Sequence, residues 1–600
     1  GPGQGSGEHW GHGLPNHRRN AVGHSGAPAG DEVMAASWRR KTAPNPADPL
    51  PGGLDTLDLA LSAILAGLLL PPTNAAPGRP PARTVHRRQA PKPTAGLTAP
   101  LTRAGDARTL GSRDPRLEES VNGLRTRQPH LSAATSLSRG QRRGLLTIAG
   151  LLLAAMVADP ATTVLVLVTV AVAVYLLAIG FRLLLMRHAL SAAPMVRVDD
   201  AAARSIPADE LPVYTVIVPV YREPEVVVPL LAAIQQLEYP SERLDVKLVV
   251  EDDDDQTLAV LAGARPGPHI EVVRVPPASP RTKPKACNYA LAAARGDLVT
   301  IYDAEDRPEP LQLRRAAAAL ARLGPEVACL QAKLAFYNPM QNRITRWFAV
   351  EYGAWFSQFL PALVTVGAPI PLGGTSNHFR REALAAAGGW DPYNVTEDAD
   401  LGIRLHRLGY RVEILDSTTY EEANSDFVNW IKQRSRWHKG YLQTWMVHMR
   451  RPRQLWRELG PSGFLGFNLF VGASPSLAVL NPVFWGLTLL WFVGKPAFIK
   501  ALFPGPVLYA GLLCFVVGNF SMVYLNLISV RANRRPELLG AVLLTPVYWL
   551  MMSLAGIKAV VQVLLMPSYW EKTAHGLDSV ATGHPIVEPQ PLGAAAVGGL

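Results

Sequence analysis

The sequence predicts an α/β, Rossmann-like domain embedded between α-helical transmembrane segments. Nearly half of the 600 residues are apolar and only 18% are charged, which is low for a protein without membrane segments. Long apolar runs flank a central region in which short apolar strands alternate with helical stretches, as they do in α/β folds. Two strands of this central region end in clustered carboxylates.

The first segment, residues 1–143, is rich in Pro, Gly, Ala and Arg. This composition buries too little apolar surface to offset the entropy of ordering, so it predicts a disordered tail. The tail holds 19 Lys and Arg against 10 Asp and Glu, or +9 of the net +11. We interpret this charge as attraction to anionic lipid and not to nucleic acid, because no nucleic-acid module follows. An apolar run at 57–70 is too short for a span and predicts an interfacial or docking helix.

Residues 144–187 predict a pair of membrane helices with a tight turn at Asp159-Pro160. Arginines lie at both ends of the pair and place these ends in the cytoplasm. They are Arg142, Arg143, Arg182 and Arg187. The next domain, 195–450, is therefore expected to be cytoplasmic. The three cysteines are far apart, which agrees with a reducing compartment. No cleavable signal peptide is recognised.

Within 195–450 the alternation predicts a sheet with covering helices. Strands are expected at 213–221, 245–255, 270–276 and 297–306, and helices at 225–238 and 285–296. Ligands of open α/β sheets bind at the carboxyl ends of strands, so the two strands that end in acids indicate one site.

Apolar character returns in 461–566, with candidate spans at 464–493, 506–530 and 538–565. The first of these fits either one long broken span or a tight hairpin, so the helix count stays open. Residues 567–600 follow the last apolar segment, and the part after Gly576 is predicted to be a disordered tail.

Several motifs contain charged side chains that could bind a ligand. Asp303 and Glu305, with Asp306 beside them, can grip a hard cation such as Mg²⁺ or Mn²⁺, although a solvated acidic turn is the commoner meaning of such a pair. The acid run 251–255 can accept hydrogen bonds from a nucleobase or a ribose. The alternative is a run of acidic residues that is simply exposed to solvent. Lys283 and Lys285 open a helix, whose N-terminus favours phosphate.

Two further motifs follow. Asp398, which follows Thr396 and Glu397, fits a general base that takes a proton from a substrate hydroxyl. The alternative is a structural role for the motif, in which Thr396 caps the helix that follows. In Gln433-Arg434-Ser435-Arg436-Trp437 the arginines can clamp phosphate and the tryptophan offers a flat face to a sugar. Membrane-flanking charge with interfacial tryptophan is the alternative explanation.

In this order the motifs resemble those of processive family 2 glycosyltransferases, the membrane synthases of cellulose, curdlan and hyaluronan. That family has an early acid, a D-x-D, a T-E-D and a Q-x-x-R-W, followed by membrane helices. The resemblance covers about residues 144–576. It implies a GT-A-type catalytic domain, and by its position the segment 569–576 resembles the gating loop of these synthases. The second residue of the D-x-D is the longer Glu305 here, which changes the geometry of the pair.

The resemblance assigns roles to these positions. It implies catalysis by Asp398 with Glu397 and Thr396, and a Mg²⁺ or Mn²⁺ ion on Asp303 and Glu305. Substrate contacts are implied for Glu251, Asp253, Lys285, Gln433, Arg434, Arg436 and Trp437. Which acid of 251–255 meets the base stays open, with Glu251 first after the strand and Asp253 next.

The implied activity is inverting, processive synthesis of a β-linked polysaccharide from a UDP-sugar, with UDP-glucose expected, and its export across the bacterial inner membrane. The implied partners are the UDP-sugar donor, the growing polysaccharide, membrane lipid and accessory secretion subunits, without nucleic acid. The nearest alternative is a non-processive transferase that adds one sugar to a lipid carrier. A transporter or scaffold with an inactive domain, or a glycosidase, would not need this set of acids and lysines. Sugar and linkage stay open.

Overall fold

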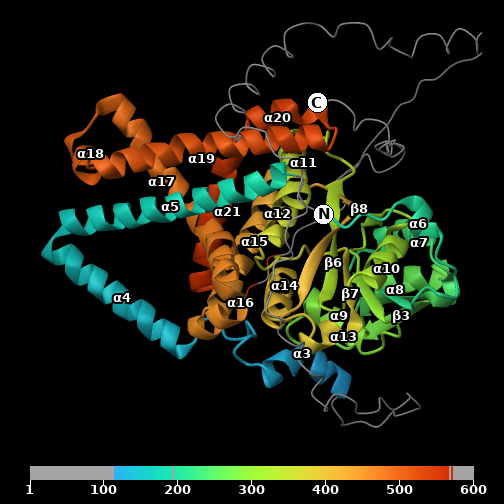
Figure 1. The fold of residues 1–600 in the computed structure, drawn as a ribbon. Coiled ribbons are helices and arrows are strands. Elements are labelled where there is room, and N and C mark those ends of the chain that lie inside the picture. Colours follow the sequence, from blue (N-terminus) through green and yellow to red (C-terminus); the bar gives the residue numbers. More distant parts are fainter. Residues whose placement is uncertain (1–113, 192–194, 567–568, 570, 572–600) are drawn as a thin grey trace, which may run out of the picture. The chain divides into compact units, whose positions relative to one another are not determined.

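The computed structural model describes residues 114–191, 195–566, 569 and 571, all of which belong to the unit Arg88–Leu600. A mixed sheet of eight strands forms the centre of the described α/β domain, with helices on both faces (Figure 1). The strands are β1 (Tyr214–Val220), β2 (Leu244–Glu251), β3 (Ile270–Val275), β4 (Leu298–Ile301), β5 (Arg307–Pro308), β6 (Val327–Phe336), β7 (Asn377–Arg380) and β8 (Arg411–Glu421). Their order is β3-β2-β1-β4-β7-β6-β8-β5.

The four strands at one side of the sheet are parallel, and this arrangement creates the site. β1 pairs in parallel with both β2 and β4, so the carboxyl ends of β2 and β4 lie on the same edge. Alternate residues of β1 enter opposite cores, as the two-residue period of a strand requires. Ile217 belongs to one buried cluster, while Val216 and Val218 belong to the other. The predicted α/β domain between apolar helices is therefore confirmed.

Helices cover both faces and support the ends of the strands. They are α6 (Asp200–Arg204), η1 (Pro224–Val226), α7 (Val227–Gln235), η2 (Ser241–Arg243), α8 (Asp255–Ala264), α9 (Lys283–Leu291), α10 (Gln312–Arg322), α13 (Arg381–Ala386), α14 (Glu397–Arg407) and α15 (Phe427–His448). A third group joins the domain to the apolar helices: α11 (Arg343–Ala354), the π-helical turn η3 (Trp355–Phe359) and α12 (Leu360–Thr365). α11 contacts both β6 and α19, and α12 contacts both β8 and α5.

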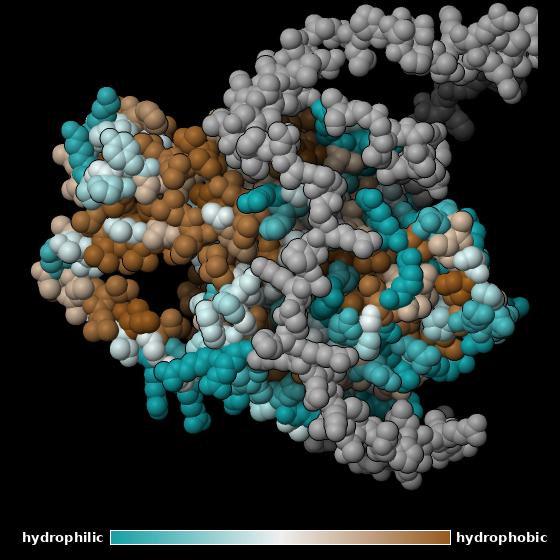
Figure 2. All heavy atoms as spheres, viewed as in Figure 1, coloured by the Kyte–Doolittle hydropathy of each residue, from teal (hydrophilic) through white to brown (hydrophobic). Residues whose placement is uncertain are grey.

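Within the described residues, five helices are long and apolar enough to cross a membrane. They are α4 (Arg139–Ala158), α5 (Pro160–Leu190), the continuous run Pro452–Gly494, α19 (Gly505–Ala532) and α21 (Thr545–Leu565). Figure 2 shows hydrophobic side chains gathered over the region of α4, α5, α17 and α19. None of the residues of α4 is buried, so its apolar surface needs lipid or a partner to leave water.

The stretch 464–493 forms one broken helix and not a hairpin. α16 (Pro452–Phe467) runs through the π-helical turn η4 (Asn468–Gly472) into α17 (Ala473–Gly494). Gly460 has a φ of 69° and kinks the run, because glycine tolerates this left-handed geometry. Short elements complete this part: α18 (Ala497–Leu502), η5 (Pro536–Leu538) and α20 (Leu539–Leu543).

The N-terminal prediction needs a correction. Residues 1–113, with the apolar run 57–70, lie outside the described residues, but the predicted disordered tail does not extend to 143. Residues 115–127 form helix α3 (Pro115–Arg127), which Asp114 caps by accepting from the Arg116 N–H. α3 buries Val121 and Leu124 and packs against α9. Residues 114–138 form the segment that we call the strap. The low overall hydropathy of this stretch concealed an amphipathic helix with a docking face.

Candidate active site

A cavity of about 790 Å³ begins at the carboxyl edge of the sheet and continues between the apolar helices. Glu251, Asp303 and Glu305 line it from the ends of β2 and β4. Asp398 of α14 and Trp437 of α15 line the same cavity. The structure thus brings acids from separate strands and the aromatic helix α15 to one space.

The acid run after β2 is divided among separate partners. Glu251 is 6% exposed and pairs with Lys285, at 2.7 Å between Oε1 and Nζ. Asp252 pairs with Arg274, Asp253 pairs with Arg281, and Asp254 accepts the Thr257 N–H that caps α8. Of this run only Glu251 lines the cavity. Burial raises the pKa of Glu251, against the opposing effect of the Lys285 ammonium.

The pair that was predicted to bind metal lies beside a lysine. Lys283 Nζ forms a short ion pair with Asp303 Oδ1 and also donates to the Gly374 carbonyl at 2.9 Å. Burial alone would lower the pKa of Lys283, but Asp303 and then Glu397 raise it, so the ammonium stays charged. Asp306 is buried and holds the turn, because its Oδ2 accepts the Asp303 N–H at 2.8 Å.

The acids fit a divalent ion that is shared with a diphosphate. Among the described residues no group of three or more His, Cys, Asp and Glu side chains is placed to hold a metal alone. Asp303 and Glu305 nevertheless both line the cavity and offer hard carboxylate oxygens. Mg²⁺ is commonly bound by one or two carboxylates plus substrate phosphates, so two protein ligands suffice for such an ion.

The Thr396-Glu397-Asp398 motif forms the start of α14. Thr396 occupies the N-cap position, but its hydroxyl makes no cap hydrogen bond and has no partner among the described residues. The helix-cap explanation for this threonine therefore does not hold. Asp398 Oδ1 accepts the Ala399 N–H at 2.7 Å, and its carboxylate lies close to Gly374.

Burial shapes the protonation of this motif. It raises the pKa of Asp398 to about 6, although the Ala399 N–H and the Lys283 ammonium lower it. Burial and then the Asp398 charge raise the pKa of Glu397 to about 8. Asp398 is therefore ionised at neutral pH while Glu397 is largely neutral. An ionised carboxylate with a pKa near 6 suits a general base at physiological pH.

Helix α15 contributes the opposite wall with Gln433, Arg434, Arg436, Trp437, His438 and Tyr441. Gln433 Oε1 is buried without a hydrogen-bond partner among the described residues, as expected of a group that awaits a ligand. α15 approaches the motif of α14 closely: a Cβ at Gly440 would lie 2.3 Å from a methyl carbon of Thr396. A glycine is required there to let the two helices meet.

The two arginines of α15 have different surroundings. Arg434 is ion-paired with Glu351, donates to the Tyr548 hydroxyl at 3.1 Å, and lies 4.4 Å from the centre of the Trp437 ring. Its charge is therefore already neutralised by the protein. Arg436 lies within electrostatic reach of Glu397, Asp303 and Asp398. Burial lowers the pKa of Arg436, and these three carboxylates oppose that shift.

Trp437 stands in an aromatic group. Its ring lies 6.3 Å from Tyr352 at an interplanar angle of 27°, and 5.9 Å from Phe348. After α21 the chain returns to α15, where Lys439 Nζ donates to the carbonyls of Met566 and Tyr569 at 2.9 and 2.5 Å. Glu571 pairs with Lys558 at 2.8 Å. The remainder of the predicted gating segment and the predicted disordered tail lie outside the described residues.

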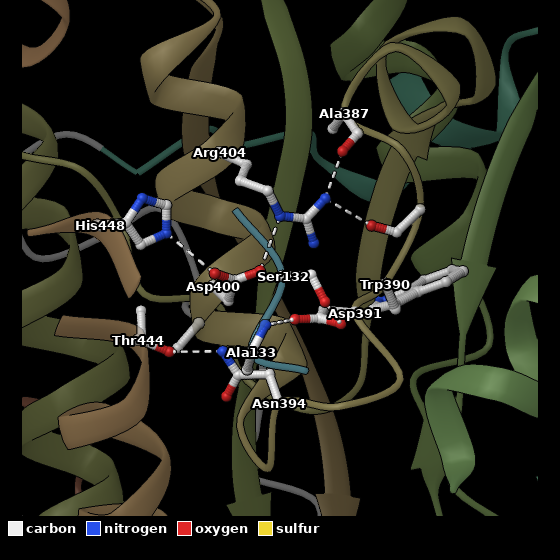
Figure 3. Close-up of polar contacts among 12 residues, drawn as sticks. Ser132, Ala133, Ala387, Trp390, Asp391, Asn394, Asp400, Arg404, Thr444 and His448 are labelled. Carbon is white, nitrogen blue, oxygen red and sulfur yellow. Dashed lines mark hydrogen bonds and ion pairs between the residues drawn. The ribbon is translucent and has the colours of Figure 1, made fainter. Parts of the chain in front are cut away.

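A network of buried polar side chains surrounds the start of α14 where the strap meets the domain (Figure 3). Asp391 accepts from the Ala133 N–H at 2.5 Å and from the Ser132 hydroxyl at 3.1 Å. Asp400 pairs with Arg404 at 2.7 Å and with His448 of α15 at 2.9 Å. Hydrogen bonds and ion pairs thereby connect the strap to the loop before Thr396, and α14 to α15.

Sequence reasoning located most of the cavity acids but missed several neighbours. Arg281 and Tyr221 line the cavity close to the strand ends, and Glu351 and Tyr352 line it close to Trp437. Glu351 and Tyr352 stand in no recognisable motif, because α11 has the pattern of an ordinary amphipathic helix. Two predicted contacts lie outside the lining: Lys285, which is buried in its pair with Glu251, and Asp253, which pairs with Arg281.

Comparison with known proteins shows what the domain is similar to. Residues 212–440 match the family described as glycosyltransferase like family 2. The chain is 33% identical over 219 residues to the beta-monoglucosyldiacylglycerol synthase of Synechocystis sp. (strain ATCC 27184 / PCC 6803 / Kazusa), covering 36% of this chain and 44% of that protein. It is 31% identical over 247 residues to the probable glucomannan 4-beta-mannosyltransferase 1 of Arabidopsis thaliana, covering 39% and 43%.

Among solved structures, the mannosyltransferase PcManGT from Pyrobaculum calidifontis, in complex with GDP-Man and Mn2+, is 20% identical with a TM-score of 0.44, covering 67% of this chain and 99% of that chain. The matched segment spans about half the length of the curated relatives that it matches. The family match covers the sheet and all motifs from the acid run to the start of α15. Over residues 212–440, which hold the sheet and the motifs that line the cavity, the chain is therefore similar to glycosyltransferases of family 2.

Proposed function

We propose that this chain is a membrane-embedded inverting hexosyltransferase that uses a nucleotide sugar, with UDP-glucose as the expected donor. The observation that carries the proposal is that Asp303, Asp398, Arg436 and Trp437 line one cavity, which continues between the apolar helices. A donor bound at the strand ends and an acceptor that arrives from the membrane can meet there.

Charge on the leaving diphosphate must be met by groups already in place, since preorganised electrostatics is usually the largest catalytic contribution. Lys283 and Arg436 supply positive charge close to Asp303. Asp303 and Glu305 would hold a Mg²⁺ or Mn²⁺ ion, which offsets the charge of the diphosphate when bound. Glu251, positioned by Lys285, is proposed to accept from the nucleobase or ribose.

Asp398 is proposed to take the proton from the acceptor hydroxyl as that oxygen attacks the anomeric carbon. A bond forms to the acceptor oxygen, the bond to the diphosphate breaks, and the configuration inverts. Trp437 stacks on the acceptor sugar, and the unpaired Oε1 of Gln433 accepts from one of its hydroxyls. Arg434 acts through Trp437 and Glu351 as a positioning residue, because its charge is neutralised by Glu351.

We propose further that the acceptor is a growing β-linked chain, which enters the bilayer along the cavity. The order of motifs and the helices on both sides of the domain support this proposal, because a polar glycan needs a protein-lined path through hydrocarbon. We propose a bacterial inner membrane location with the domain in the cytoplasm, and the arginines at the helix ends support that orientation of the domain. Addition of one sugar to a lipid is the second candidate, and the apolar walls between the helices favour it.

The experiment is incubation of the full chain in membrane vesicles with labelled UDP-sugars, followed by sizing of the product and digestion with linkage-specific hydrolases. Release of UDP with a ladder of products supports polymerisation, whereas one product of lipid mobility supports the second candidate. D398N is expected to abolish transfer and to retain donor binding. D255N, at an exposed acid of α8, is the control. Wild-type turnover by D398N would refute the role of Asp398 as the base.

A further inference from the structure

The charge of the cavity changes along its length. The acids of its lining all come from residues 223–422, at the domain end. At the other end α5, α17 and α19 contribute apolar side chains, among them Ala178, Ile179, Leu477 and Met522, together with uncharged polar ones, Ser474, Asn481, Asn519 and Asn526. Among the described residues, Arg182 is the single charged side chain that these three helices add to the lining. We call this part the helical end of the cavity.

Arg182 has no counter-charge in the described part of the chain, where it makes neither a hydrogen bond nor an ion pair. The group within its electrostatic reach is the Tyr175 hydroxyl, and a phenol is not an anion at neutral pH. The Tyr175 hydroxyl donates to Asn481 Oδ1 at 2.5 Å, so α17 already holds it. A cation among apolar helices is costly unless it is paired, and such residues usually mark a ligand path.

Snorkelling toward the headgroups is the simpler explanation for an arginine near a helix end. Arg187 fits it, because this residue lies on the last turns of α5 and is exposed. Arg182 lies five residues earlier, is partly buried and lines the cavity. α5 packs along α19 (Figure 1). The two helices are so close here that a Cβ at Gly518 would lie 2.9 Å from the Ile179 side chain. Arg182 therefore faces an internal space in which the described residues supply no anion to pair with it.

We propose that the helical end of the cavity binds the phosphate of a lipid acceptor through Arg182. The apolar wall of α5, α17 and α19 suits a hydrocarbon tail, and the guanidinium can grip phosphate oxygens in a two-point geometry. A sugar carried on that phosphate would then lie toward Trp437 and Asp398. A neutral glycan would leave Arg182 unpaired, so an uncharged polymer alone does not account for this residue.

The inference rests on the proposed function, because it places the ligand in the acceptor path of the same cavity. It concerns the anchor of the acceptor and not the length of the product. A lipid phosphate can prime a growing chain or receive one sugar, so either product is compatible with it.

Binding is measured on the full chain in nanodiscs of phosphatidylcholine, without any donor. The probes are radiolabelled farnesyl phosphate, farnesol, which lacks the phosphate, and inorganic phosphate, which lacks the lipid. The variants are R182Q, R182K and the matched control R187Q, an exposed arginine of the same helix. UDP binding and a monodisperse profile in size-exclusion chromatography show that each variant is folded.

Farnesyl phosphate should bind the wild type at least about ten-fold tighter than farnesol, which corresponds to ~1.4 kcal/mol. R182Q should remove this difference, whereas R182K and R187Q should keep most of it, and inorganic phosphate should not compete at equal concentration. Equal affinity for the two lipids, or an undiminished preference in R182Q, overturns the proposal. Competition by inorganic phosphate as strong as by farnesyl phosphate would reassign the site to a free anion and also overturn it.

These outcomes are separate from those that test the proposed function. A chain that binds farnesyl phosphate through Arg182 but never releases UDP from a UDP-sugar would contradict the transferase proposal alone. A chain that releases UDP and shows no preference for the phosphorylated lipid would contradict this inference alone.

Discussion

Arg434 and Glu351 form a two-point ion pair at the wall of the cavity, with 2.9 Å between Nη1 and Oε1 and a short second contact. The guanidinium also lies 4.3 Å from the centre of the Phe348 ring and 4.4 Å from that of Trp437. Glu351 thus fixes the cation, and the cation fixes the tryptophan. The pair connects α11, which joins the domain to α19, with the helix that carries the proposed acceptor platform.

R434K should test this arrangement. Lysine keeps the charge but loses the planar two-point contact and the stacking on both rings. We expect an increase in acceptor KM of about ten-fold, which corresponds to ~1.4 kcal/mol, with donor binding unchanged. Steady-state kinetics with a soluble glycan or lipid acceptor, and donor binding by calorimetry, measure the two effects. R453K, at an exposed arginine of α16, is the control. A loss of donor affinity alone would instead favour direct phosphate contact by Arg434.

The pH dependence of the reaction should report Asp398. Burial raises its pKa to about 6, and a base must be ionised to accept a proton. As the pH falls through 6, the ionised fraction of Asp398 falls, so kcat/KM should decrease with a slope of one proton. Above pH 7 this limb should be flat. D398E should retain an acidic limb at a shifted pH, whereas D398N should retain no transfer. An acidic limb unchanged in D398E would assign it to another group.

Metal removal should stop transfer before it affects folding. Without a divalent ion, the negative charge of the diphosphate would lie close to the carboxylates of Asp303 and Glu305, with Lys283 and Arg436 as the protein cations to offset it. Treatment with EDTA is expected to abolish UDP release, and Mg²⁺ or Mn²⁺ should restore it. D303N should raise the metal concentration needed for half-maximal activity about ten-fold or more, while the melting temperature changes little. Full activity in EDTA, with metal content checked by mass spectrometry, would show that Lys283 and Arg436 suffice.

Local patterns predict much of this fold. The strands predicted at 213–221 and 270–276 follow from short-range periodicity and lie within a residue or two of β1 and β3. Helix ends were less accurate: the helix predicted at 285–296 starts at Lys283 and ends at Leu291. The mixed order of the sheet, with β7 antiparallel to β4, could not be predicted, because pairing between distant strands leaves no local signal.

Positions in the site were predictable where the chemistry is carried by a motif. Asp303, Asp398 and Trp437 were all placed at one cavity. Partner choice was not predictable: Lys285 pairs with Glu251, and Arg434 pairs with Glu351, a residue 83 positions away. Such pairs depend on which helix packs beside which strand end, and that is a property of the tertiary structure.

Asp391 connects the strap to the loop that precedes α14. The Asp391 carboxylate, which is fully buried, accepts from Ala133 and Ser132 of the strap and also from the Tyr393 N–H at 3.2 Å. D391N places an amide nitrogen against donors of the strap. A hydrogen bond to a charged group contributes about 1.5–3 kcal/mol, so local opening of 391–398 should increase roughly ten- to a hundred-fold.

Hydrogen exchange measures that opening, and kcat should fall because Asp398 lies at the end of the loosened loop. A133P removes the strap's N–H without touching Asp391 and should reproduce both effects, whereas S132A, which loses a weaker bond at 3.1 Å, should produce smaller ones. Agreement between D391N and A133P would locate the effect in the contact itself. Faster exchange in both variants with unchanged kcat would show that the strap stabilises this loop without positioning Asp398.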